Sequence, residues 1–385
     1  MMPPIDPIAS LPIVAWWPVR TLLLVLALAC IGATALAFRH GTALPRAAAT
    51  GLTMILLMVN AGAAVNAYYA YFPTLGEALG GSVSDETTLA DADADVGRIP
   101  AEGMVVPVTI PGTASGFVGR PAQVYLPPAW FAKPRPQLPV ILLLHGIPGG
   151  PTDWTEGGDA AATADAFAAA HRGVAPVLVM PDVNGSDVND TECVDSPRGN
   201  VETYLTEDVP AEVVATFGTH SPAPGTWAIA GLSEGGTCAI MLALRHPTLF
   251  GTFGDFGGLL GPRVGDTNDD PDDATVTTLF GGSQAAYDAH QPELLLADPG
   301  PGLRGMGGWF QVGSDDPLPL AAVQALAPLA GRAGIETCLV VVPGGDHTFD
   351  VWSASLRASL PWMAARLGLA PITPQLTAAC AAPVG

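Results

Sequence analysis

Two long apolar runs come first in the pattern of hydrophobic and polar positions along the chain. Residues 21–38 carry no charge, and a second uncharged run covers residues 47–67. About 18 apolar residues are enough for one membrane-spanning helix. Arg39 and Arg46 lie between the two runs. Because cytoplasmic loops are enriched in Lys and Arg, the pattern predicts two transmembrane helices joined by a cytoplasmic loop, with both ends of this hairpin on the outer side.

Arg20, just before the first run, favours the opposite orientation. A secretory signal peptide followed by a buried helix is the alternative, but a basic n-region and a small-residue cleavage site are both poorly developed here. We therefore expect an N-terminal membrane region over residues 1–72. Residues 73–100 are rich in Gly, Ala and acidic residues and lack hydrophobic periodicity, so they predict an acidic linker.

From about residue 101 onward, short apolar runs alternate with helical patterns, and several runs have the continuous hydrophobicity typical of buried parallel strands. We expect strands over residues 104–110, 122–127, 138–146, 175–182, 226–231, 252–258, 308–313 and 337–345. We expect helices over residues 160–171, from about 201, and over 234–245, 318–331 and 349–366. This alternation predicts an α/β fold, a mostly parallel sheet with helices on both faces, over residues 101–370, followed by a tail at 371–385.

Polar residues stand at the expected C-terminal ends of these strands, where parallel sheets place functional groups. Ser233 lies in a Gly-x-Ser-x-Gly motif between a buried strand and an apolar helix, Asp315 and Asp316 follow a later strand, and His347 follows the last one. This order of serine, acid and histidine is that of the α/β-hydrolase triad. Because serine needs a base to take its proton, the pattern predicts Ser233 as nucleophile, His347 as base, and Asp315 or Asp316 as the acid.

The oxyanion formed during such chemistry needs N–H donors. The helix that starts at Glu234 directs its free N–H groups toward Ser233, so the Glu234 N–H is the first candidate donor. The Ile147 N–H, in the loop after the strand at 138–146, is the second. We expect His145 to fix this loop by hydrogen bonding, and Trp154 to line the acyl pocket.

Composition narrows the possible partners. The chain has 15 Lys and Arg against 36 Asp and Glu, a net charge of −21, which argues against nucleic-acid binding. The five cysteines include no CxxC pair, so no zinc site is predicted, and no cofactor is expected. Outside the cytoplasm the last four could form two disulfides in any of three connectivities. The cysteines are Cys30, Cys193, Cys238, Cys338 and Cys380.

Five segments together resemble the Putative esterase family of α/β hydrolases, which includes S-formylglutathione hydrolases, siderophore and feruloyl esterases, and secreted mycolyltransferases. They are LLLHGIPGG, MPDVNGS, VETYLTEDVPAEV, GLSEGGTCAIMLALRHPTLFG and PGGDHTFDVW, and the resemblance covers roughly residues 105–367. It implies a triad of Ser233, His347 and Asp316, because relatives often place the acid three residues after the strand-end glycine, here Gly313. The loop after the third strand lacks the arginine of mycolyltransferases, which argues against trehalose mycolyl transfer.

These observations predict a serine esterase anchored in the cell membrane with its catalytic domain outside the cytoplasm. Its substrate would be a carboxylic ester, with lipid and glycolipid esters among the candidates. Two alternatives remain open: a cell-envelope acyltransferase of the mycolyltransferase kind, and a catalytically inactive, envelope-anchored binding protein. The sequence does not choose the acyl length or the alcohol.

Overall fold

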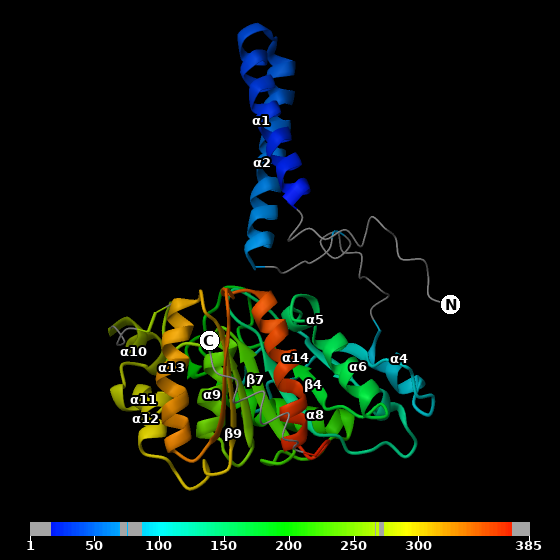
Figure 1. Ribbon diagram of the computed structural model, residues 1–385, viewed down its shortest axis with the longest axis vertical. Helices are drawn as coiled ribbons and strands as arrows, with labels where there is room; N and C mark the ends of the chain where they lie inside the picture. The colour runs from blue at the N-terminus through cyan, green and yellow to red at the C-terminus, as the bar shows by residue number, and fades with distance from the viewer. Residues whose placement is uncertain (1–16, 70–74, 76–86, 266, 269–272, 372–385) are drawn as a thin grey trace. The chain divides into compact units, whose positions relative to one another are not determined.

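The computed structural model describes residues 17–69, 75, 87–265, 267–268 and 273–371 (Figure 1). The chain separates into two compact units, Met1–Ser84 and Asp85–Gly385. The predicted tail begins at the end of the described residues and lies almost wholly outside them, as does most of residues 70–86.

The first unit contains two long helices, α1 (Trp17–His40) and α2 (Ala43–Tyr69). Most of their large apolar side chains are exposed. Between the helices, the Thr34 and Thr53 hydroxyls are hydrogen-bonded at 2.9 Å, and Asn60 Nδ2 donates to a backbone carbonyl of α1 at 3.1 Å. Apolar stretches of 20 and 25 residues make both helices long and apolar enough to cross a membrane.

The structure differs from the expected linker just before the second unit's sheet. Helix α4 (Leu89–Ala94) forms there because Thr88 Oγ1 accepts the Asp91 N–H at 3.2 Å, and the Asp91 carboxylate accepts the Thr88 N–H at 2.9 Å. These reciprocal hydrogen bonds form a capping box that satisfies free donors of the first turn. Ala92 on this helix is buried. Asp91 thus caps a helix that packs against the second unit through Ala92.

An eight-stranded sheet forms the centre of the second unit, in the order β1-β2-β4-β3-β7-β8-β9-β10. The pairs β1–β2 and β2–β4 are antiparallel and all others are parallel, which confirms the predicted mostly parallel sheet. The strands are β1 (Met104–Val108), β2 (Ala122–Leu126), β3 (Val140–Leu144), β4 (Val177–Met180), β7 (Trp227–Leu232), β8 (Thr252–Phe256), β9 (Gly307–Gly313) and β10 (Glu336–Val342). A separate two-stranded ribbon joins β5 (Asp195–Ser196) to β6 (Gly199–Asn200).

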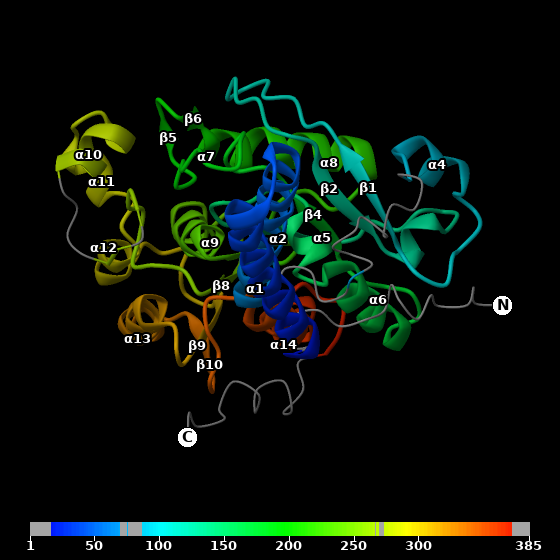
Figure 2. The same cartoon turned by 90° about the horizontal axis from the view of Figure 1, so that it is seen from above.

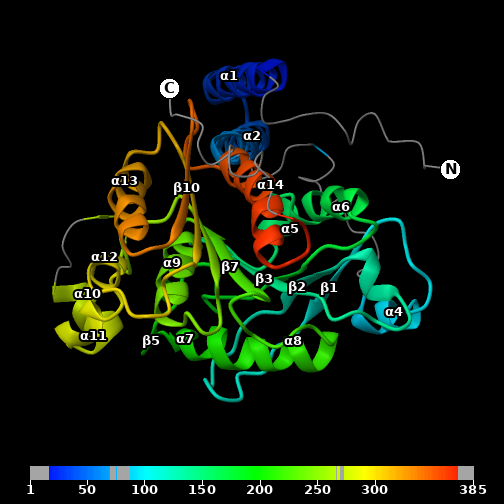
Figure 3. The same cartoon turned by 60° about the horizontal axis from the view of Figure 1, so that its bottom comes forward.

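Helices cover both faces of this sheet. Helices α6 and α14 lie on one face, and α8, α9 and α13 lie on the other (Figure 3). Helices α10, α11 and α12 lie together at the β10 end of the unit, opposite α4 and β1 (Figure 2). The helical elements are η1 (Pro128–Phe131), α5 (Asp153–Glu156), α6 (Ala160–Ala170), α7 (Val201–Thr203), η2 (Tyr204–Asp208), α8 (Val209–Phe217), α9 (Glu234–Arg245), α10 (Asp273–Phe280), α11 (Gln284–Asp288), α12 (Pro292–Ala297), α13 (Pro317–Arg332) and α14 (Phe349–Arg366).

The apolar strands explain this layered arrangement. Every residue of β3, β4, β7, β8 and β9 is buried, as expected for strands covered on both faces. Their carboxyl ends meet at one edge, because parallel neighbours point the same way. That edge carries the residues described next.

Candidate active site

Ser233 occupies a strained turn between β7 and α9. Its φ and ψ are 53° and −123°, an uncommon conformation for a residue with a side chain. A Cβ at Gly231 would lie 2.1 Å from Gly235 O, and a Cβ at Gly235 would lie 2.4 Å from Leu144 O. Both motif glycines are therefore needed for the chain to pack this closely. The result is a serine presented at the tip of a sharp strand-to-helix turn.

His347 joins Ser233 to Asp316. His347 Nε2 lies 2.9 Å from Ser233 Oγ, and His347 Nδ1 lies 2.6 Å from Asp316 Oδ2. Because an ionised carboxylate only accepts, Nδ1 is the donor in this pair. In the neutral ring Nε2 then carries no hydrogen and accepts the serine hydroxyl. The three predicted residues thus form one chain of hydrogen bonds.

The geometry separates the two candidate acids. Asp316 is at the start of α13 and faces His347, whereas Asp315 Oδ1 accepts the Ser314 hydroxyl at 2.9 Å. Asp346, next to the histidine in sequence, accepts the backbone N–H of His347 at 2.8 Å instead of a ring N–H. Asp316 is therefore the carboxylate that orients His347.

The loop after β3 lies against the nucleophile. A Cβ at Gly146 would come 2.9 Å from Ser233 Cβ, so only a glycine allows this approach. The next residue in the loop is Ile147, the second candidate oxyanion donor. Glu234 is the first residue of α9, and the first N–H groups of a helix have no intrahelical acceptor. Both predicted donors belong to segments that border Ser233.

An ionic network holds this loop, and no pattern in the sequence indicated this network. His145 Nδ1 donates to Gly146 O at 2.8 Å, as expected for a residue that fixes the loop, and His145 Nε2 lies 3.1 Å from Asp182 Oδ1. The Arg120 guanidinium donates to Asp182 at 2.8 and 2.9 Å, and to Gly149 O at 2.8 Å. The loop is therefore held at both ends, on either side of Ile147.

Asp182 is fully buried in this network. Burial alone would raise the pKa of Asp182, but hydrogen bonds from the Arg120 side chain and from backbone N–H groups outweigh burial and hold that pKa far below its usual range. Asp182 is therefore ionised and fixes the arginine. Arg120 is 62 residues away in sequence and precedes β2, so no local motif connects the two.

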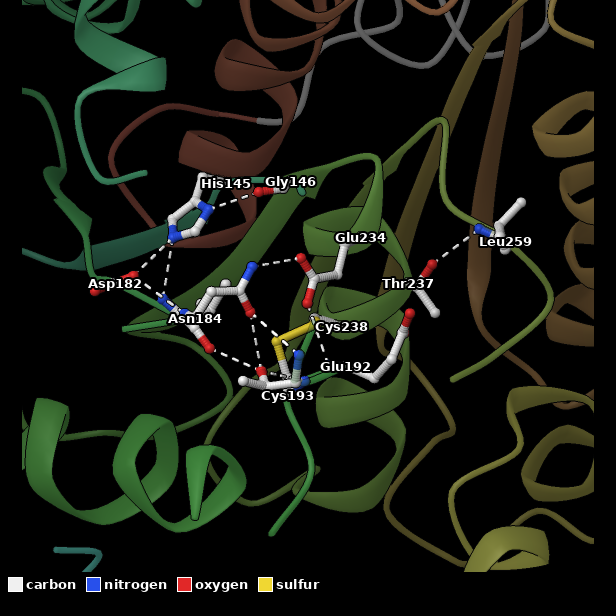
Figure 4. The surroundings of a disulfide bond; sticks show 12 residues. His145, Gly146, Asp182, Asn184, Glu192, Cys193, Glu234, Thr237, Cys238 and Leu259 are labelled. Atoms are coloured by element: carbon white, nitrogen blue, oxygen red, sulfur yellow. Dashed lines mark hydrogen bonds and ion pairs between the residues drawn. A yellow bond between two sulfur atoms is a disulfide. The ribbon is translucent and has the colours of Figure 1, made fainter. Parts of the chain in front are cut away.

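Next to this network, the Glu234 carboxylate binds the segment that follows β4 (Figure 4). Oε2 accepts from Asn184 Nδ2 at 2.8 Å, and Oε1 accepts the Glu192 N–H at 3.2 Å. Burial raises the pKa of Glu234 to about 7. Cys193 and Cys238 form a disulfide directly beside these contacts, so this segment is covalently tied to α9.

The Cys193–Cys238 disulfide is one of the pairs that the sequence left open, and its Cα–Cα distance is 5.7 Å. Cys338 is disulfide-bonded as well, whereas Cys380 lies outside the described residues, so its pairing stays a prediction. Cys30, in α1, is a free thiol.

Two tryptophans differ in their relation to the site. Trp154 was expected to line the acyl pocket, but it is fully buried, and its Nε1 donates to Leu144 O at 2.9 Å. It packs below the loop against Phe256 and offers no surface to a substrate. Trp352 packs edge-on against the His347 ring with centroids 4.9 Å apart, and no pattern in the sequence indicated that contact.

The sheet order, the strained serine turn and the serine–histidine–aspartate chain define this molecule as an α/β hydrolase. The sequence model of the family described as Putative esterase matches residues 119–363. The chain belongs to this family, and it is an ester-hydrolysing enzyme.

The chain is also similar to other known proteins. An uncharacterized protein of Corynebacterium glutamicum is 36% identical over 339 residues, covering 83% of this chain and 78% of that protein. Among solved structures, a ferulic acid esterase has a TM-score of 0.58 at 20% identity, covering 69% of this chain and 99% of that one. An S-formylglutathione hydrolase from Agrobacterium tumefaciens has a TM-score of 0.56 at 21% identity, covering 70% and 97%.

Proposed function

We propose that this protein is a membrane-anchored serine esterase that cleaves carboxylic esters through an acyl-enzyme. The observation that carries the proposal is the hydrogen-bond chain from Ser233 Oγ through His347 to Asp316. A serine hydroxyl is a weak nucleophile until a base accepts its proton, and an imidazole at 2.9 Å is placed to do so. A protein that only binds esters has no need for this arrangement.

In the first half-reaction Ser233 Oγ attacks the ester carbonyl while His347 Nε2 takes the hydroxyl proton. The carbonyl oxygen becomes an oxyanion, which the N–H groups of Ile147 and Glu234 stabilise. Asp316 keeps Nδ1–H in place and stabilises the imidazolium. The C–O bond then breaks, His347 gives its proton to the departing alcohol, and the acyl group remains on Ser233.

In the second half-reaction water attacks the acyl-enzyme. His347 takes a proton from the water, and the tetrahedral intermediate forms at the same oxyanion donors. The bond to Ser233 Oγ breaks, the serine recovers its proton from His347, and the carboxylic acid leaves. The imidazole thus acts as base and then as acid in each half.

Substitutions at the site test the proposal. Ser233→Ala should lower kcat for a p-nitrophenyl ester by about 10⁴-fold or more and abolish labelling by a fluorophosphonate probe. Asp316→Asn should lower kcat by about 10⁴-fold, because the amide cannot hold the same imidazole tautomer. Asp315→Asn is the matched control and should change kcat less than about threefold. Full activity in Ser233→Ala, or equal losses at both aspartates, would refute the assignment.

The location outside the cytoplasm rests on two observations. Arg39 and Arg46 flank the turn between two helices long enough to cross a membrane, which favours a cytoplasmic turn. The Cys193–Cys238 disulfide suits an oxidising compartment. Alkaline phosphatase fused after Gly97 should be active. A fluorescent protein that becomes fluorescent only in the cytoplasm should be dark when it is fused at the same position. The reverse pair of results would place the catalytic unit inside.

A further inference from the structure

Asp255 is a fully buried carboxyl group beside the nucleophile that the proposed mechanism does not use. It lies on β8, directly opposite Gly231 of β7 in the sheet register. Its Oδ1 accepts the Gly258 N–H at 2.8 Å, while Oδ2 has no hydrogen-bond partner among the described residues. A buried polar atom without a partner costs free energy, so its presence calls for a physical reason.

The surroundings of this carboxyl group are made of backbone. A Cβ at Gly236 would lie 2.7 Å from Asp255 Oδ1, and a Cβ at Gly258 would lie 2.6 Å from it. These two glycines therefore leave the space that the carboxyl group fills. Burial raises the pKa of Asp255 to about 7, and the Gly258 N–H is the only contact that favours its charged form. Asp255 is accordingly a neutral acid over most of the acidic range.

The turn that follows Asp255 borders the triad. Phe256 O accepts the Ser233 N–H at 3.1 Å. Gly257 has a φ of +75°, and a Cβ there would lie 3.7 Å from both His347 Cε1 and Asp316 Oδ2. The backbone from Phe256 to Gly257 therefore lies beside the serine, the imidazole and the carboxylate.

Two side chains fix this turn to the rest of the unit. Asp255 accepts the Gly258 N–H, and Thr237 Oγ1, from the first turn of α9, accepts the Leu259 N–H at 2.9 Å. The aspartate holds the residue that directly follows Gly257. The position of Gly257 against His347 thus depends on the oxygen of Asp255.

We propose that Asp255 is a positioning residue for the proposed esterase reaction: its Oδ1 holds the turn at residues 256–258, which sets Ser233 and His347 at their working distance. The inference rests on the proposed function, because it concerns the same triad. It makes Asp255 part of the support of the site without contact with substrate. A displacement of about 1 Å between reacting groups can cost about 100-fold in rate.

The test compares two substitutions in the full chain. Asp255→Asn keeps an oxygen acceptor at the Oδ1 position, and Asp255→Leu fills a similar volume without one. For a p-nitrophenyl ester, we expect Asp255→Asn to keep kcat within about threefold and Asp255→Leu to lower kcat by about tenfold or more, with KM within about threefold in both. The rate of fluorophosphonate labelling should fall in parallel with kcat.

A second buried carboxylate is the matched control. Asp208 accepts the N–H groups of Ala114 at 2.7 Å and Ser115 at 3.0 Å, and neither residue belongs to the triad turn. Asp208→Leu should lower stability while kcat per folded molecule stays within about twofold. Asp255→Ala, which adds no atoms, replaces Asp255→Leu if the leucine variant does not fold, with the same expected loss.

The outcomes separate this inference from the proposed function. Wild-type kcat per folded molecule in Asp255→Leu or Asp255→Ala would overturn the inference, and so would equal losses at Asp208 and Asp255. An equal loss in Asp255→Asn would overturn it as well, because the acceptor is retained there. If the wild type neither hydrolyses esters nor reacts with the fluorophosphonate, the proposed function itself fails.

Discussion

Asp182 and Asp255 stand on opposite sides of Ser233, and both are fully buried. Asp182 receives hydrogen bonds from the Arg120 guanidinium and from two backbone N–H groups. Asp255 receives one, from a backbone N–H, and no cation among the described residues affects its pKa. The pKa of Asp182 is therefore held far below its usual range, whereas burial raises that of Asp255 to about 7. Equal burial produces opposite charge states because the neighbours differ.

The two carboxyl groups also give opposite dependences of stability on pH. The folded pKa of Asp182 is depressed, so its contribution is present above the unfolded pKa and is lost as pH falls. The folded pKa of Asp255 is raised, so its contribution is complete below the unfolded pKa and is lost as pH rises through about 7. The loop after β3 is thus held by the ionised Asp182, whereas the turn at residues 256–258 is held by the neutral acid Asp255.

The largest expected effect on stability comes from removing the ionised carboxylate, Asp182. Asp182→Ala leaves the Arg120 guanidinium without its buried acceptor, and should destabilise the second unit by about 3 to 5 kcal/mol. Asp187 binds the same arginine but is 78% exposed, so Asp187→Ala should cost less than about 1 kcal/mol. Urea unfolding followed by tryptophan fluorescence measures both. Equal effects would show that burial does not distinguish the two carboxylates.

A somewhat smaller effect on stability is expected from replacing the neutral acid, Asp255. The rise in the pKa of Asp255 to about 7 corresponds to a loss of about 4 kcal/mol in the free energy of unfolding as this group goes from protonated to ionised. Asp255→Asn cannot ionise, so its stability relative to wild type should increase by up to about 4 kcal/mol between pH 4 and 7.5. Urea unfolding across this range measures the difference.

Asp208→Asn is the control for this measurement, because hydrogen bonds from Ser115 and Ala114 outweigh burial and lower the pKa of Asp208. Its stability relative to wild type should therefore decrease as pH rises from the acidic range. A flat difference for Asp255→Asn would contradict the neutral state that we assign to Asp255.

The smallest of the three effects concerns the covalent support beside Glu234. Cys193 and Cys238 close a loop of 45 residues, and replacing both by serine should cost about 3 kcal/mol. Amides at residues 184–193 should then exchange faster with solvent, while those of the turn at residues 256–258 should not. Cys30→Ser, at a free thiol in α1, should change neither quantity. Faster exchange on both sides of Ser233 would show that the two supports are not separate.

Local patterns in the sequence were sufficient for the strands of the main sheet and for the serine, histidine and acid that the structure joins by hydrogen bonds. Continuous apolar runs marked the buried strands, and the motif around Ser233 lay at the end of one of them. His347 was found because it follows the last strand. The residues by themselves left Asp315 and Asp316 open, and only the resemblance to relatives favoured Asp316, because neighbouring residues point in different directions that the packed fold decides.

The supports of the site could not be predicted in the same way. The contact between Arg120 and Asp182 joins residues 62 positions apart, so it exists only once β2 and β4 have paired. The burial of Trp154 follows from its hydrogen bond to Leu144 O, which depends on how the loop after β3 folds back. The state of Asp255 depends on two glycines from different segments. Each is a property of the packed fold.

The pairing of α1 with α2 has a further consequence for an enzyme anchored as we propose. An even number of crossings returns the chain to the side from which it entered, whatever lies between. The Thr34–Thr53 hydrogen bond joins the two helices, and an apolar phase offers no water to compete for it. Loss of one helix would therefore change the parity of the anchor and deliver the hydrolase to the opposite face of the membrane, away from its esters.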